Sequence, residues 1–176
     1  MATVPAEITW VSGQVVTAAQ LNTNLRDAVN FLINKPTCQV RQTVSQNLTT
    51  GSAAAIAFDT EDVDNDNMHS TTTNTTRLTA VTSGRYHVGG GYCAASTTGR
   101  KEVWVRINGG DVNGTESGVP GGSAVATGPA LRGVSIFLNA GNYTELWVFQ
   151  DSGGTIATSV SGAQQASFFA LWTGTT

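Results

Sequence analysis

Residues 101–108 read KEVWVRIN, and this stretch decides the fold class. Successive side chains of a β-strand point to opposite sides. Val103, Val105 and Ile107 therefore face one side, while the larger polar and amphipathic residues between them face the other. Such alternation predicts a strand with one face in a core and the other at the surface.

Two later stretches are apolar on both sides of the predicted strand. Residues 143–150 read YTELWVFQ and residues 168–172 read FFALW. A strand that is apolar on both faces is covered on both faces. In one small sandwich the second cover is most simply a neighbouring subunit, so these stretches predict a subunit interface. The residues selected by this argument are Tyr143, Trp147, Phe149, Phe168 and Trp172.

Short stretches with strand character follow one another after Pro36, separated by Gly, Asn, Asp and Ser turns. The predicted strands are residues 39–45, 53–58, 76–81, 85–94, 102–108, 131–139, 143–150, 155–160 and 166–172. No helical pattern lies between them, so the sequence predicts a mainly β protein, an antiparallel sandwich of the Greek-key or jelly-roll type. The glycine-rich stretch 109–128 is expected to be a long exposed loop of the kind that often carries recognition.

Residues 1–36 differ from this pattern and predict an N-terminal segment with one short α-helix, ahead of a knob over residues 37–176. Thr17 can cap a helix with Gln20 at its third position, and apolar residues then recur at spacings of three and four as far as Leu32. The helix is expected to span about residues 18–34, because Pro36 disfavours helical geometry in the residue before it.

This helix covers about two heptads, which is too short to hold a coiled coil together unaided. It could line a trimer axis, pack beneath the knob or dock on another protein. The sequence leaves these three arrangements open.

Charged residues make up only 12% of the chain, and the net charge is −3. There is no basic cluster, so the electrostatic attraction behind sequence-independent nucleic-acid binding is missing. No apolar stretch reaches the roughly 18–20 residues of a membrane span, and no signal-peptide pattern opens the chain. We therefore expect no nucleic-acid partner, no membrane insertion, and synthesis in a cytosol.

Cys38 and Cys93 lie far apart in the sequence, without metal-type spacing. A reducing cytosol favours two free thiols. A disulfide between the two cysteines is the alternative.

The acidic run from Asp59 to Asp66 is the best candidate for a metal site. Alternating carboxylates in a loop suit Ca²⁺, which takes six to eight oxygen ligands, and Asp62, Asp64 and Asp66 would supply them. The run departs from an EF-hand, since Asn67 stands where that loop needs glycine and the flanking helices are missing. The alternative is a solvated, Asn-rich turn in a protein that needs no cofactor.

No stretch of the sequence has the pattern of a catalytic site. Ser117 comes one place too late for a nucleophile elbow, and acids outside the run at 59–66 are too few for a glycosidase carboxylate pair. His69 and His87 lie in different segments, and zinc would need two further ligands. We therefore expect no enzyme activity.

Trp104 has the clearest case for ligand binding among the aromatic residues, since Glu102 and Arg106 place it on the polar face of its strand. A flat ring complements the apolar face of a sugar, which makes host-surface carbohydrate the ligand class to consider. Packing in the core or in an interface is the alternative for most other aromatic residues.

One group of N-terminal residues carries a family resemblance. It comprises Trp10-Val11-Ser12-Gly13, Val16-Thr17-Ala18-Ala19, Leu21-Asn22, Leu25-Arg26-Asp27, Asn30-Phe31-Leu32 and Pro36. Together these residues resemble the attachment segment at the start of many phage minor tail and fibre proteins. The resemblance implies that the protein is joined to a virion through Trp10, Leu21, Leu25, Phe31 and Leu32.

A second group is spread over most of the remaining chain. It comprises Ile56-Ala57-Phe58-Asp59, residues 61–66, Met68-His69, Thr76-Arg77-Leu78-Thr79, Gly84-Arg85-Tyr86-His87-Val88, residues 105–109 and residues 145–153. These stretches resemble the phage version of the jelly roll found in tumour necrosis factor and in complement globular heads. This resemblance implies a homotrimer with a largely apolar axis, and it places the ring of Tyr86 near that axis.

Together the two resemblances imply a phage virion protein, assembled in the host cytoplasm and located on the tail or capsid surface. One function is a trimeric knob of a tail fibre or tail tip that binds the host surface. The other is a capsid decoration or head-fibre protein with an architectural role. The sequence leaves the receptor and the position on the virion open.

Overall fold

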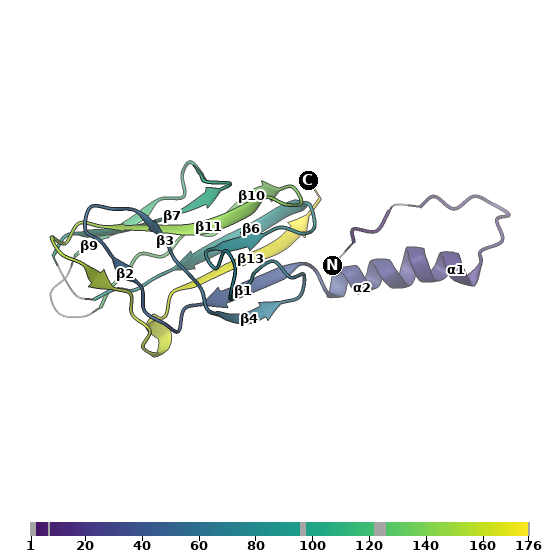
Figure 1. The fold of residues 1–176 in the computed structure, drawn as a ribbon. Helices are drawn as coiled ribbons and strands as arrows, with labels where there is room; N and C mark the ends of the chain where they lie inside the picture. Colours follow the sequence, from purple (N-terminus) through teal and green to yellow (C-terminus); the bar gives the residue numbers. More distant parts are fainter. Residues whose placement is uncertain (1–2, 7, 96–97, 122–125, 176) are drawn as a thin grey trace.

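The computed structural model describes residues 3–6, 8–95, 98–121 and 126–175. It contains a two-sheet knob with an N-terminal extension that projects from one end (Figure 1). The extension starts beside the knob, runs away from it, and turns back as a helix that leads into the first strand. The predicted class, a mainly β antiparallel sandwich preceded by one short helix, is confirmed.

The helix begins and ends where the sequence predicts. Its three parts are α1 (Ala18–Leu21), a π-helical turn (Asn22–Arg26) and α2 (Asp27–Ile33). Thr17 and Gln20 form the capping box, in which the Gln20 side chain accepts the Thr17 backbone N–H at 2.9 Å. The π-helical turn was not predicted from the sequence.

Phe31 attaches this helix to the knob. Its side chain is only 7% exposed, and its ring meets the ring of Trp172 edge-on with 4.9 Å between centroids. Val4, near the start of the extension, packs against the same core. The rest of the helix projects away (Figure 1), so the arrangement in which it packs beneath the knob is excluded.

Sheet I has the strand order β10-β6-β13-β1-β4, with every neighbouring pair antiparallel. Its strands are β1 (Thr37–Arg41), β4 (Thr60–Asp64), β6 (Gly84–Gly91), β10 (Val134–Leu138) and β13 (Ser167–Gly174). Neighbours in this sheet are distant in the sequence, so the chain crosses repeatedly between the sheets, as in a jelly roll.

Sheet II has the order β3-β11-β7-β8, with β5 also paired to β11 and β9 to β7. Its strands are β3 (Ala54–Ala55), β5 (Arg77–Thr79), β7 (Arg100–Ile107), β8 (Gly110–Asp111), β9 (Ser117–Pro120) and β11 (Tyr143–Gln150). A separate short pair joins β2 (Asn47–Leu48) to β12 (Ile156–Ala157), and a 3₁₀ turn (Gly162–Gln164) precedes β13.

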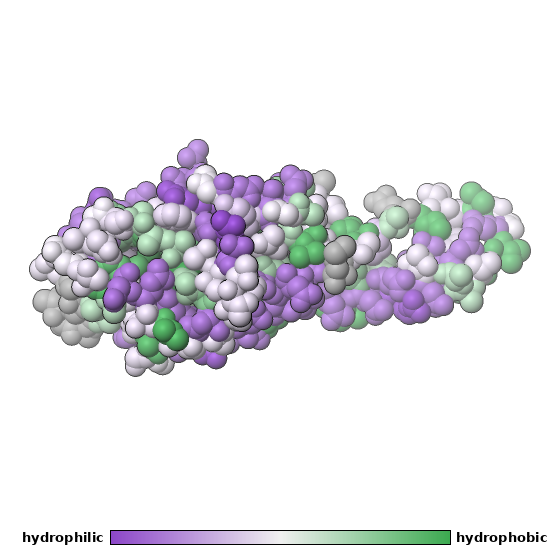
Figure 2. Space-filling model, viewed as in Figure 1, coloured by the Kyte–Doolittle hydropathy of each residue, from purple (hydrophilic) through white to green (hydrophobic). Residues whose placement is uncertain are grey.

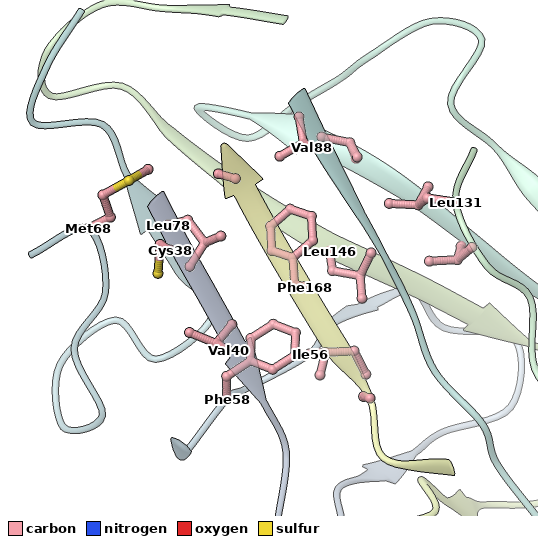
Figure 3. Packing of buried hydrophobic residues seen from close by; sticks show 14 of the residues in the cluster. Cys38, Val40, Ile56, Phe58, Met68, Leu78, Val88, Leu131, Leu146 and Phe168 are labelled. Carbon is pink, nitrogen blue, oxygen red and sulfur yellow. The ribbon is translucent and has the colours of Figure 1, made fainter. Parts of the chain in front are cut away.

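The inner faces of the two sheets meet in one apolar core (Figure 3). Val40 of β1 lies opposite Phe168 of β13, and both side chains are fully buried. Phe58 stacks on Phe168 with 6.2 Å between ring centroids, and Leu146 enters the same core from sheet II. Each such buried side chain is worth roughly 1.5–3 kcal/mol, so packing between the sheets is a major source of stability.

Most predicted strands are present with shifted ends, and the prediction for residues 143–150 matches β11 at both ends. Two predictions were wrong. The acidic run forms the edge strand β4, because its backbone pairs with β1 although its side chains are polar. The stretch 109–128, expected to be one loop, contains β8 and β9, while residues 122–125 lie outside the described part.

Gly84, at the start of β6, lies against the indole of Trp172. A methyl group there would overlap Nε1 of Trp172 and lie 2.6 Å from the carbonyl oxygen of Gly174. We expect Gly84→Ala to lower the free energy of unfolding by about 1–3 kcal/mol in urea denaturation. The matched control is Gly110→Ala, whose added methyl meets nothing closer than 3.5 Å and should have an effect within about 0.5 kcal/mol. Equal stability of the two variants would contradict this packing.

Candidate functional site

The aromatic residues on the outer face of sheet II lie under arginines of the same chain. The guanidinium carbon of Arg77 is 3.9 Å from the ring centroid of Tyr143, and that of Arg106 is 3.7 Å from the centroid of Trp147. Glu145 holds this arrangement, since it accepts hydrogen bonds from Arg77 Nε at 3.3 Å and from Trp147 Nε1 at 3.1 Å. Such cation–π contacts are worth about 0.5–2 kcal/mol each.

Asp111 fixes the side chains of Trp104 and Arg106 on the same face. Its Oδ1 accepts hydrogen bonds from Arg106 Nε at 2.6 Å and from Trp104 Nε1 at 2.7 Å. These two hydrogen bonds hold the pKa of the Asp111 carboxyl below its ordinary value, and the bond from Arg106 has the larger effect. Trp104 lies beside Trp147 with 6.4 Å between ring centroids, so its indole is fixed on two sides.

A third arginine covers Phe149. The guanidinium carbon of Arg100 is 5.0 Å from the Phe149 centroid. Arg100 is itself paired with Glu102 at 2.7 Å and with Asp151 at 3.0 Å. Arginine suits this position because its planar group can stack on a ring while its edge binds carboxylates.

The predicted subunit interface through Tyr143, Trp147 and Phe149 must therefore be corrected. These side chains are half-buried within a single chain, because Arg77, Arg106 and Arg100 lie over them. The second face of β11 is covered, as predicted, but the cover comes from the same chain.

The same prediction for Tyr86, Phe168 and Trp172 also needs correction. Their side chains are 0%, 0% and 8% exposed, since they lie on the inner face of sheet I. The Tyr86 hydroxyl donates a hydrogen bond to the Thr82 carbonyl at 2.6 Å. These three residues belong to the core and cannot present their side chains to a neighbouring subunit.

The outer face of sheet I, which we call the open face, keeps apolar side chains exposed. Phe137 and Val63 are each 45% exposed, and Leu171 is 37% exposed. The tip of the Phe169 ring lies against Gly89, where a Cβ atom would be 2.6 Å from Cζ of the ring. Within the described part of the chain, no arginine stacks on either phenylalanine of this face.

Strand register places these residues together across the sheet. Leu171 of β13 pairs with His87 of β6, and Phe169 pairs with Gln39 of β1, which also pairs with Val63 of β4. His87 lies against Phe169 with 5.9 Å between ring centroids. The apolar pattern of residues 168–172 did indicate a second exposed face, but its members are Phe169 and Leu171 instead of Phe168 and Trp172.

A depression of about 460 Å³ lies beside Trp104 on the outer face of sheet II. Arg100, Glu102 and Trp104 of β7 line it together with Phe149 of β11. Asp111 of β8 lines it from the other side, together with residues 112–114 and Glu116 in the connection between β8 and β9. The sequence indicated Trp104 through the polar residues beside it, but it gave no signal that Phe149 lies nearby.

The carboxylates predicted to bind calcium have separate partners. Asp62 binds Arg41 Nε at 2.7 Å, and Asp64 accepts two backbone N–H groups of the following loop at 2.9 Å each. Asp66 is fully buried and accepts a hydrogen bond from Thr82 Oγ1 at 2.9 Å. Among the described residues, no group of three or more His, Cys, Asp or Glu side chains could hold a metal ion. The predicted calcium site at Asp62, Asp64 and Asp66 is therefore corrected. Asp62 and Asp64 lie on strand β4, Asp66 follows it, and each carboxylate binds a different partner.

Asp59 organises the turn after β1. Its carboxylate accepts hydrogen bonds from Thr43 Oγ1 at 2.6 Å, from the Val44 N–H at 2.7 Å and from Thr60 Oγ1 at 2.9 Å. Burial acts to raise the pKa of Asp59. The hydrogen bonds outweigh burial and lower this pKa, and those from Thr43 have the largest effect among them.

Both cysteines are free thiols in the structure. Cys38 is fully buried in the core, and burial raises the pKa of its thiol. Cys93 is half-buried after β6.

Solved structures with a similar fold belong to the tumour necrosis factor type. Murine APRIL at pH 8.5 has a TM-score of 0.57 at 8% identity, and the alignment covers 77% of this chain and 98% of that one. Eiger TNF from S. frugiperda has a TM-score of 0.53 at 10% identity, with 81% and 96% covered. At such identities the likeness shows the fold alone, and it confirms the predicted TNF-like jelly roll. No protein-family model and no curated protein sequence matches the chain.

Asp59→Asn tests the turn contacts through their pH dependence. At neutral pH we expect the substitution to lower the free energy of unfolding by about 1 kcal/mol. The pKa of Asp59 is lower in the folded protein than in the unfolded chain, where it is about 3.9. The stability that the Asp59 carboxylate contributes is therefore complete above the unfolded-state pKa and is lost as pH falls through the folded-state pKa. The stability gap between wild type and variant should therefore narrow at about pH 2, measured by urea denaturation. Glu116→Gln, at an exposed position, is the control, and a gap independent of pH would contradict the assignment.

Proposed function

We propose that this chain is a bacteriophage virion-surface protein whose knob forms a homotrimer through the open face. One observation carries the proposal: sheet II covers its outer aromatic residues with its own arginines, whereas sheet I leaves Phe137, Leu171 and Val63 exposed. Exposed large apolar side chains gathered on one face of a sheet suit an interaction site.

A second copy of the chain is the partner that best fits this face. Gln39, Phe169 and Leu171 lie across its middle, as apolar and uncharged residues do in the centre of a subunit interface. Arg85 lies opposite Phe137 at one end of this face. The tip of the Phe169 ring occupies the space that a side chain at position 89 would fill. Support for three subunits comes from the resemblance of this chain to jelly rolls that trimerise. In this arrangement Tyr86 supports the open face from inside the core.

The N-terminal extension is the proposed attachment to the virion. Large apolar side chains are exposed along it, and they stand out where it projects from the knob (Figure 2). They are Ile8, Trp10, Val11, Val15, Val16, Leu21, Leu25, Val29, Leu32 and Ile33. Phe31 has a different role from the one expected, since it packs on Trp172. Two arrangements remain for the helix, which either lines the trimer axis or docks on another virion protein.

No helix in the described part of the chain is long and apolar enough to cross a membrane.

The proposal places the knob on a tail fibre or tail tip, where it binds the host surface without catalysing a reaction and without a cofactor. The depression beside Trp104 favours this role over a purely architectural one on the capsid, because it offers a binding site on the face that the trimer leaves free. Immunogold labelling of intact virions tests the position. Label at the tail is expected, and many labels on the head with none at the tail would contradict it.

Charge on the open face should separate the subunits. We expect wild-type protein to sediment as a trimer at micromolar concentration, and Leu171→Asp to sediment as a folded monomer, because a buried unpaired carboxylate is costly. Val44→Asp is the matched control, since Val44 is 70% exposed outside this face. A monomeric wild type in analytical ultracentrifugation would refute the trimer.

Charge on the extension should prevent attachment to the virion and leave the knob folded. Leu25 and Leu32 are 60% and 62% exposed on the helix. We expect Leu25→Asp with Leu32→Asp to leave the knob folded and to abolish incorporation into virions, measured by immunoblotting of purified particles. Wild-type levels in particles would contradict the attachment role.

A further inference from the structure

We propose that the depression beside Trp104 binds a segment of oligosaccharide that carries no negative charge, either neutral or amine-bearing. This inference rests on the proposed host-binding function and names the ligand class. The volume of about 460 Å³ lies within the range of roughly 300–1,000 Å³ typical of small-molecule sites.

The aromatic part of the depression is rigid before any ligand arrives. Trp104 is held through Nε1 by Asp111 at 2.7 Å and lies beside Trp147. Phe149 also lines the depression but lies under Arg100, so Trp104 is the ring on which a sugar would stack. A ring fixed in this way loses little conformational entropy on binding, which raises the affinity for a flat apolar partner. The faces of pyranose rings provide such a partner, since their C–H bonds form an apolar surface that fits an aromatic ring.

The polar groups beside these rings are mainly acceptors. Glu102, Asp111 and Glu116 line the depression, and their carboxylates can accept hydrogen bonds from sugar hydroxyls or amines. Asn113 adds an amide that both donates and accepts. Aromatic surface with a few polar groups on one side is the usual composition of a site for a small polar ligand.

Charge decides between sugar classes. Three carboxylates line the depression, whereas Arg100 is the guanidinium that lines it and already pairs with Glu102 and Asp151. A uronate, sialate or phosphate group would meet like charge here, with no unpaired cation to receive it. Neutral sugars avoid this repulsion, and amino sugars gain attraction.

Gly118 of β9 is paired with Glu102, one of the residues that line the depression. A Cβ atom at Gly118 would lie 3.3 Å from Cγ of Glu102, so a larger side chain would lie across that carboxylate. Substitution here can obstruct the depression without changing Trp104.

The test measures binding to full-length protein by isothermal titration and by quenching of tryptophan fluorescence. The probes are neutral oligomers of glucose, galactose, mannose, rhamnose and N-acetylglucosamine, oligomers of glucosamine, and anionic oligomers of galacturonic acid and sialic acid. We expect at least one neutral or amine-bearing probe to bind, and anionic probes to bind at least about tenfold more weakly, which corresponds to about 1.4 kcal/mol.

Variants assign the binding to this site. Trp104→Ala and Gly118→Val should each weaken binding of the best probe about tenfold or more, and Trp104→Phe should weaken it less. Glu116→Gln should reduce affinity for glucosamine oligomers more than for neutral ones. Tyr143→Ala is the matched control, since Tyr143 also lies under an arginine on the same face but outside the depression, and it should bind normally.

Three results would overturn the inference: no probe binds, an anionic probe binds best, or Trp104→Ala and Gly118→Val both bind like wild type. Adsorption to cells of the propagating bacterium separates this failure from failure of the proposed function. Equal adsorption by wild type and Trp104→Ala, with no sugar bound in the titrations, would refute the sugar site and leave host binding intact. Sugar binding without adsorption of the wild type would refute host binding and leave the site intact.

Discussion

Both sheets of the knob carry apolar side chains on their outer faces, and each outer face therefore needs a cover. On sheet II the cover is internal, since Arg77, Arg100 and Arg106 lie over the aromatic residues and are fixed there by carboxylates. Among the described residues, no arginine covers the phenylalanines on the open face of sheet I. In the proposed assembly, this difference leaves one side of the knob for its own copies and the other for a ligand.

This difference depends on a small number of charges, because only 12% of the chain is charged. The arginines on sheet II both shield rings and position carboxylates such as Glu102 and Asp111 beside the depression. The same contacts that stabilise a single chain therefore also shape the candidate binding site. Glycine also matters on both outer faces, since Gly89 leaves room for the ring of Phe169 and Gly118 leaves room for the side chain of Glu102.

The sequence predicted the elements whose patterns are local. The capping box at Thr17 and the ends of β11 follow from neighbouring residues. The succession of strands predicts an antiparallel sandwich of the Greek-key or jelly-roll type, and the family resemblance selects the jelly roll. It could not predict contacts between distant segments. Arg77 binds Glu145 from 68 positions earlier in the chain, and β4 is a strand only because β1 pairs with it. Burial of Lys101, whose Nζ donates to the Ala95 carbonyl at 2.9 Å, is likewise a consequence of the fold.

The central claim is that copies of this chain cover the open face while the outer face of sheet II stays accessible. Hydroxyl-radical footprinting of the native protein, read by mass spectrometry, tests it residue by residue. Protection of Phe137 and Leu171, with modification of Trp104 and of exposed Val44, is the result that the account predicts. Rapid modification of Phe137 and Leu171, at the rate of Val44 after correction for intrinsic reactivity, would contradict it.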